Sequence, residues 1–154
     1  MPDPIRVILV DDQSLVRSGF RMLIEAEDDM EVVAEASSGV EALDVLRRMP
    51  VDVALMDIRM PQMDGVEATR RITESPLDTK VLILTTFDLD EYVYAALKAG
   101  ASGFLLKDAR PTELLSAIRN VAAGDAVVAP SATRRLLDHV VPTLPSDPKA
   151  CLLY

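Results

Sequence analysis

The sequence alternates between short, unbroken apolar runs and longer amphipathic stretches, and this alternation repeats five times before Gly124. An unbroken apolar run is typical of a strand that is buried on both faces of a parallel sheet. The stretches between the runs place apolar residues three and four positions apart, which predicts helices with one buried face. The predicted strands are Val7–Val10, Val32–Ala34, Val53–Met56, Val81–Leu84 and Phe104–Leu106.

The helices can be bounded by their apolar faces and by the residues that start or stop them. Pro50 should end the second helix, Gly100 should close a fourth helix that begins near Glu91, and Pro111 should open a fifth that stops at Gly124. The predicted buried faces are Val16, Phe20, Leu23 and Ile24 in the first helix, Val40, Leu43 and Leu46 in the second, Val66, Thr69 and Ile72 in the third, and Leu114, Leu115, Ile118 and Val121 in the fifth.

Five strand–helix units with short connections predict an α/β fold whose parallel sheet is covered by helices on both faces. We expect this domain to occupy residues 1–125. Residues 126–154 have the composition of a linker, with room for one short helix over 130–140 before the prolines at 142, 145 and 148.

Charge and composition exclude several classes of function. The chain carries 25 acidic and 16 basic residues, a formal net charge of −9, so we expect no direct binding of nucleic acid. Its longest apolar runs are far shorter than the about 20 residues of a membrane-spanning helix, and its start lacks the features of a secretory signal. The single cysteine, Cys151, can form no internal disulfide. Together these features predict a cytoplasmic protein without a membrane partner.

Polar residues follow four of the five predicted strands. Asp11 and Asp12 follow the first strand, Asp57 the third, Thr85 the fourth and Lys107 the fifth. Because parallel strands point the same way, these side chains should meet at one edge of the sheet, where open α/β folds bind their ligands. Clustered carboxylates repel one another unless a cation joins them, and oxygen ligands of this kind suit Mg²⁺. A phosphoryl group on one carboxylate could then be met by the ammonium and the hydroxyl.

Four stretches of the sequence resemble the receiver domains of bacterial two-component response regulators. They are Ile8–Asp12, Met56–Gly65, Leu84–Thr86 and Gly100–Lys107. The resemblance covers about residues 5–124, and the combination and order of the motifs make it specific. It implies a flavodoxin-like, doubly wound sheet of five parallel strands in the order 2-1-3-4-5, with five helices.

The resemblance also implies a role for each residue at the predicted edge. Asp57 would accept a phosphoryl group from a sensor histidine kinase. Mg²⁺ would be bound by Asp12, Asp57 and the backbone carbonyl of Arg59, with Asp11 acting mainly through a water molecule. Thr85 and Lys107 would contact the phosphoryl oxygens. Phe104 stands where the family places an aromatic side chain that reorients when the threonine engages the phosphate.

Further features resemble the LuxR/NarL (FixJ) type of response regulator. Lys107 is followed by Asp108, where many receivers have proline, and Leu105–Ala109 and Ala129–Ser131 match that type as well. This resemblance implies a homodimer on phosphorylation and a role in transcription. DNA would be bound only through a helix-turn-helix domain that lies beyond the linker and outside this chain.

Three other functions can be compared with the sequence of the predicted site. A haloacid-dehalogenase phosphatase would need a second aspartate at the position of Arg59, and arginine cannot act as its general acid. A nucleotide-binding module would need a glycine-rich turn where the chain has Asp11–Ser14, so no nucleotide cofactor is expected. A stand-alone receiver that signals by protein contact remains the main alternative. His139, the single histidine, is interpreted as a linker residue and not as a phosphorelay site.

The resemblance places Arg59 and Phe87 beside the path that a water molecule would take to the phosphoryl group. Both side chains are large, and neither is suited to orient that water. We therefore expect slow self-dephosphorylation, with no turnover of a small-molecule substrate.

Overall fold

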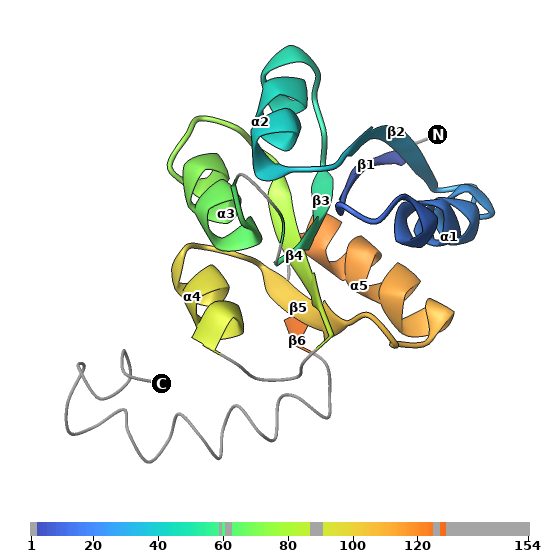
Figure 1. Ribbon diagram of the computed structural model, residues 1–154. Coiled ribbons are helices and arrows are strands. Elements are labelled where there is room, and N and C mark those ends of the chain that lie inside the picture. The colour runs from blue at the N-terminus through green and yellow to red at the C-terminus, as the bar shows by residue number, and fades with distance from the viewer. Residues whose placement is uncertain (1–2, 59, 61–62, 87–90, 125–126, 129–154) are drawn as a thin grey trace.

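The computed structural model describes residues 3–58, 60, 63–86, 91–124 and 127–128 of the chain as a parallel sheet between two layers of helices. The strands are β1 (Ile5–Val10), β2 (Met30–Ala36), β3 (Val53–Asp57), β4 (Lys80–Thr85), β5 (Gly103–Leu106) and β6 (Val127–Val128). The helices are α1 (Ser14–Glu25), α2 (Gly39–Arg48), α3 (Gly65–Thr73), α4 (Glu91–Lys98) and α5 (Pro111–Ala122). Figure 1 shows α1 and α5 on one side of the sheet and α2, α3 and α4 on the other.

The strands lie in the order β2-β1-β3-β4-β5-β6, and each neighbouring pair is parallel. The five predicted strands and their order 2-1-3-4-5 are therefore confirmed. The short β6 is an addition to the predicted sheet, because residues 127–128 fall in the segment predicted as linker. The boundary at residue 125 stays a prediction, and the helix expected over 130–140 lies outside the described residues.

The core consists of the strand residues and one face of each helix. Val7 to Val10 are at most 2% exposed, as expected for a strand that is covered on both faces. In α3 the predicted face of Val66, Thr69 and Ile72 is buried, and the Thr69 hydroxyl donates to the Gly65 carbonyl at 2.6 Å. That bond satisfies a buried polar group that would otherwise destabilise the fold.

The prediction for Val40 was wrong. Its side chain is 50% exposed, although its three-residue spacing from Leu43 suggested the buried face. The buried stripe of α2 instead contains Gly39, Ala42, Leu43 and Leu46. One residue turns a helix by about 100°, so Val40 is rotated away from Gly39 toward water.

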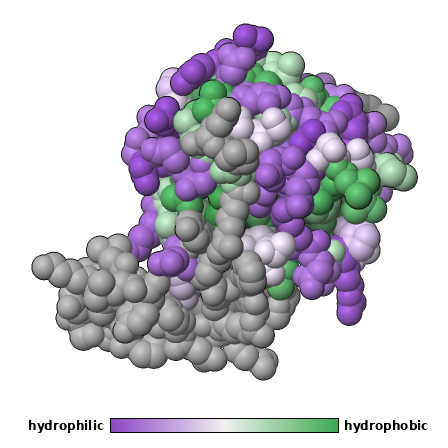
Figure 2. Space-filling model, viewed as in Figure 1, coloured by the Kyte–Doolittle hydropathy of each residue, from purple (hydrophilic) through white to green (hydrophobic). Residues whose placement is uncertain are grey.

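Helix α1 also exposes large apolar side chains. Leu15 and Met22 are 85% and 76% exposed, and Figure 2 shows a hydrophobic patch over this helix on an otherwise mixed surface. Of the predicted inward face, Ile24 is fully buried, Phe20 and Leu23 are partly buried against the core, and Val16 has intermediate exposure. Within the part of the chain that the structure describes, no helix has the length and apolar character needed to cross a membrane.

Candidate functional site

The polar residues predicted to converge do lie together at the carboxyl ends of the strands. Asp11 follows β1, Asp57 is the last residue of β3, Thr85 ends β4 and Lys107 follows β5. Asp11, Asp57 and Thr85 are buried, with 4%, 6% and 1% of their surfaces exposed, whereas Asp12 is exposed. The edge therefore presents two buried carboxylates and one that is open to water.

The three carboxylates form a compact acidic cluster. One oxygen each from Asp11, Asp12 and Asp57 can be chosen so that all three lie within 4.8 Å of one another. Oxygen atoms at this separation can share one small cation, and carboxylate oxygens are the ligands that Mg²⁺ prefers. The donor set therefore fits the metal that the sequence predicted, through Asp11, Asp12 and Asp57.

Lys107 provides the positive charge in the site. Its ammonium nitrogen lies 2.9 Å from Asp11 Oδ2 and 3.4 Å from Asp57 Oδ1. Burial lowers the pKa of Lys107, but the hydrogen bond with Asp11 and the charge of Asp57 outweigh it and hold the pKa above its ordinary value. With three carboxylates and one ammonium, the site has a formal charge of −2, which favours binding of a divalent cation.

The backbone joins the ends of neighbouring strands at this edge. The Lys107 N–H donates to the Thr85 carbonyl at 2.8 Å, and the Asp11 N–H donates to the Ala36 carbonyl at 3.0 Å. The Asp11 carboxylate also accepts a 2.9 Å hydrogen bond from the Gln13 N–H. Asp11 is thus oriented by β2, by the turn into α1 and by Lys107.

Gly65 allows α3 to start directly against the chain that follows Asp57. Its N–H donates to the Ile58 carbonyl at 2.9 Å. A Cβ atom at Gly65 would lie 2.5 Å from the Asp57 carbonyl oxygen and 2.8 Å from the Ile58 Cα, closer than any side chain tolerates. Only glycine fits at this position, so Gly65 fixes the path of the chain that follows Asp57.

Phe104 lies in β5 and is fully buried. It is paired in register with Ile83, two residues before Thr85, so it belongs to the core directly behind the edge. Arg59 and Phe87, expected to supply a metal-binding carbonyl and to limit water access, lie outside the described residues.

Sequence reasoning missed Arg17. Its guanidinium donates through Nη1 to the backbone carbonyl of Asp11 and through Nε to Glu35 at 2.9 Å. The only signal in the sequence was an arginine beside Val16 near the start of an amphipathic helix, which is the usual position of a solvated charge. The contact depends on how α1 is rotated against β1 and β2, and no motif encodes it.

Residues 7–119 match the model of one protein family, the response regulator receiver domain. This chain belongs to the response regulator receiver family. The matched segment contains every residue of the acidic cluster, Lys107 and the threonine at the end of β4.

Curated relatives of this receiver domain are regulatory proteins by name. It is 49% identical over 125 residues to the uncharacterized transcriptional regulatory protein YxjL of Bacillus subtilis, covering 81% of this chain and 57% of YxjL. It is 42% identical over 138 residues to the oxygen regulatory protein NreC of Staphylococcus carnosus, covering 89% of this chain and 64% of NreC. The chain therefore spans less than two thirds of the length of either relative.

Solved structures place the domain among regulators of the LuxR and NarL type. A LuxR-family two-component response regulator from Aurantimonas sp. SI85-9A1 superimposes with a TM-score of 0.83 at 35% identity, covering 90% of this chain and 99% of that one. The signal receiver domain of the response regulator NarL from Mycobacterium tuberculosis gives a TM-score of 0.77 at 39% identity, covering 80% and 99%. The expected family and fold are confirmed.

Proposed function

We propose that this receiver domain accepts a phosphoryl group on Asp57 from a sensor histidine kinase and thereby controls transcription. The observation that carries the proposal is the cluster of Asp11, Asp12 and Asp57 against Lys107 at the carboxyl edge of the sheet. In such a cluster one carboxylate can act as nucleophile while a cation bound at the same site offsets the negative charge.

Each residue of the edge has a distinct task in this proposal. An Asp57 oxygen forms a bond to phosphorus while the bond from phosphorus to the donor's nitrogen or oxygen breaks, and the leaving group takes a proton from solvent. Bound Mg²⁺ would neutralise negative charge on the transferring group. Asp12 and Asp57 would hold the ion, with Asp11 assisting through water and Arg59 through its carbonyl. Lys107 would then exchange part of its contact with Asp57 for a phosphoryl oxygen.

Thr85 and Phe104 would convert the new charge into a change of shape. Thr85 ends β4 and is 1% exposed, so its hydroxyl can move only a short distance toward a phosphoryl oxygen. Phe104 lies in the adjacent strand and would follow, biasing a two-state surface toward a homodimer. The name of one relative, the transcriptional regulatory protein YxjL, supports transcription as the output, with DNA bound by a further domain of the parent protein. We also propose a cytoplasmic location and slow loss of the phosphoryl group.

The central test is intact mass after incubation with acetyl phosphate and Mg²⁺. We expect one phosphate adduct on the wild type and none on Asp57→Asn. Asp44→Asn, which changes an exposed aspartate on α2, should be modified like the wild type. An adduct of normal yield on Asp57→Asn would assign the phosphoacceptor elsewhere.

The switch requires a separate test. Thr85→Ala should still be phosphorylated on Asp57 but should not dimerise in response. Thr86→Ala, at the exposed neighbouring position, should be phosphorylated and should dimerise like the wild type. The measurement is sedimentation velocity with and without acetyl phosphate. Normal dimerisation of phosphorylated Thr85→Ala would remove Thr85 from the signalling path.

A further inference from the structure

Arg17 lies where three elements meet beside the acidic edge. It belongs to α1, its Nη1 donates to the carbonyl of Asp11 after β1, and its Nε donates at 2.9 Å to Glu35 of β2. The Arg17 side chain is 17% exposed and that of Glu35 is 29% exposed, so both are largely removed from water. A planar guanidinium can make both bonds at once, which a lysine ammonium at the end of a flexible chain does less well.

The accepted carbonyl belongs to the peptide bond between Asp11 and Asp12. Fixing that oxygen fixes the plane of the peptide, and with it the direction in which the chain presents Asp12. The other polar groups of Asp11 are engaged by Ala36, Gln13 and Lys107. None of these contacts acts on the Asp11–Asp12 peptide oxygen, so Arg17 adds a constraint that they do not supply.

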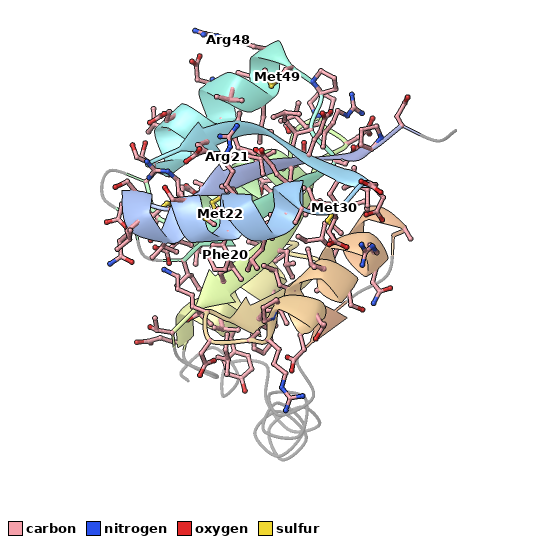
Figure 3. All side chains as sticks on the ribbon, turned by 90° about the vertical axis from the view of Figure 1, so that its right-hand side faces the viewer. Phe20, Arg21, Met22, Met30, Arg48 and Met49 are labelled. Carbon is pink, nitrogen blue, oxygen red and sulfur yellow. The ribbon has the colours of Figure 1, made fainter. Side chains whose placement is uncertain are left out.

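Glu35 makes this arrangement compatible with cation binding. An unpaired guanidinium close to the acidic cluster would repel a divalent cation, whereas the Glu35 carboxylate balances the charge of Arg17. Glu35 is itself positioned, because its second oxygen accepts a 2.5 Å hydrogen bond from Arg21, which also binds Glu25 at 2.6 Å. Figure 3 shows Arg21 extending from α1 toward β2, while Met22 points away from the sheet.

We propose that Arg17 is a positioning residue that holds the Asp11–Asp12 peptide in the orientation needed to bind Mg²⁺. The inference rests on the proposed function, because it concerns the same metal site. It adds a residue of α1 to a site otherwise built from the ends of strands, and it gives Glu35 the supporting role of orienting and neutralising Arg17.

Arg21 supplies a matched control. Arg21→Gln removes ion pairs with Glu35 and Glu25 but leaves the contact between Arg17 and Asp11 intact. Arg17→Gln removes an ion pair with the same Glu35 together with the bond to the Asp11 carbonyl. Both variants lose one positive charge on α1 and an ion pair with Glu35, so a difference between them reports the carbonyl contact.

The first readout needs no metal. The Gln13 N–H donates to the Asp11 carboxylate, so its hydrogen exchange, followed by NMR in metal-free buffer, reports order in this turn. We expect exchange at least tenfold faster in Arg17→Gln and less than twofold faster in Arg21→Gln, relative to amides in β4 of the same variant. Equal protection of Gln13 in the wild type and Arg17→Gln would overturn the proposal.

The second readout is the dissociation constant of Mg²⁺, from an NMR titration with the metal alone. Arg17→Gln should bind at least fivefold more weakly, Glu35→Gln should show a smaller loss, and Arg21→Gln should stay within twofold of the wild type. Unchanged affinity in Arg17→Gln, or an equal loss in Arg21→Gln, would refute the positioning role. A wild type that binds no Mg²⁺ would contradict the proposed function, while the exchange of Gln13 would still test the contact.

Discussion

The two edges of the parallel sheet each carry a close ion pair, but they balance charge in different ways. At the amino edge, the Asp52 carboxylate accepts from the Arg6 N–H at 2.8 Å and from the Arg6 Nε and Nη2 at 3.2 Å each. The Asp52 N–H donates to the Arg6 carbonyl, and the Lys80 N–H donates to the Asp52 carbonyl, both at 2.9 Å. Here one carboxylate pairs with one guanidinium, and backbone hydrogen bonds hold Asp52 in place.

At the carboxyl edge, three carboxylates lie close to a single ammonium. Lys107 contacts Asp11 and Asp57, and Asp12 completes the acidic cluster. Two of these carboxylates are buried, where repulsion between like charges is poorly screened. The charges at the amino edge are therefore balanced and stabilise the fold. The carboxyl edge keeps an excess of negative charge that a bound cation can neutralise. The following predictions test this contrast.

The largest effect is expected from Lys107→Gln in metal-free buffer. The change leaves Asp11 and Asp57 without their cation, and breaking a largely buried pair should lower the free energy of unfolding by about 2–4 kcal/mol. Urea denaturation measures this, and Mg²⁺ should recover part of the loss. Lys80→Gln, an exposed lysine at the amino edge, should change stability by less than about 0.5 kcal/mol. Equal losses of stability in the two lysine variants would contradict the proposed difference between the two edges.

Removing the amino-edge carboxylate should also destabilise the fold, but by less. Asp52→Ala loses hydrogen bonds from the Arg6 side chain and backbone, yet the Asp52 side chain is 37% exposed and water screens the pair. We expect a loss of about 1–2 kcal/mol that is the same with and without Mg²⁺. A loss that depends on Mg²⁺ would show that the two edges are coupled.

Removing a carboxylate should have the opposite effect on the free energy of unfolding at the carboxyl edge. Asp12→Ala removes one of three mutually repelling charges, so it should raise the free energy of unfolding in metal-free buffer by about 1 kcal/mol or less. It should also abolish stabilisation by Mg²⁺ and phosphorylation of Asp57. Thermal unfolding in EDTA and in excess Mg²⁺ compares the two states, and a lower metal-free melting temperature would argue against repulsion in the cluster.

The smallest expected effect is a dependence on pH at the amino edge. Burial raises the pKa of Asp52, but the hydrogen bonds from Arg6 outweigh it and hold the pKa below its ordinary value of about 4. A carboxyl whose pKa is lower in the folded state contributes stability above its unfolded pKa and loses it as the pH falls. The stability difference between wild type and Asp52→Asn, from urea denaturation, should therefore be constant from pH 7 to 5 and shrink below about pH 4. If the stability difference between wild type and Asp52→Asn persists below about pH 4, it arises from packing and not from the charge of Asp52.

Much of the fold and of the site could be predicted from the order of residues along the chain. A parallel sheet brings the ends of its strands to one edge, so Asp11, Asp57, Thr85 and Lys107 had to converge once the strands were recognised. The apolar runs sufficed for that recognition, because strands buried on both faces leave a continuous signal. Residue type alone gave the chemistry of the cluster, because carboxylate oxygens are ligands that suit a hard cation such as Mg²⁺.

What the sequence could not determine depends on how the elements are rotated and packed against one another. The exposure of Val40, the addition of β6 and the contact of Arg17 with the Asp11 carbonyl belong to this group. A helix presents several faces with similar spacing, and only its packing on the sheet decides which one is buried and which charged side chain reaches the backbone of another strand. The sequence by itself therefore determined which chemical groups meet at the carboxyl edge. The tertiary structure decided how they are held there. The contact of a long side chain such as Arg17, and the pairing of a short edge strand such as β6, depend on residues far away in the chain and leave no periodic pattern in the sequence.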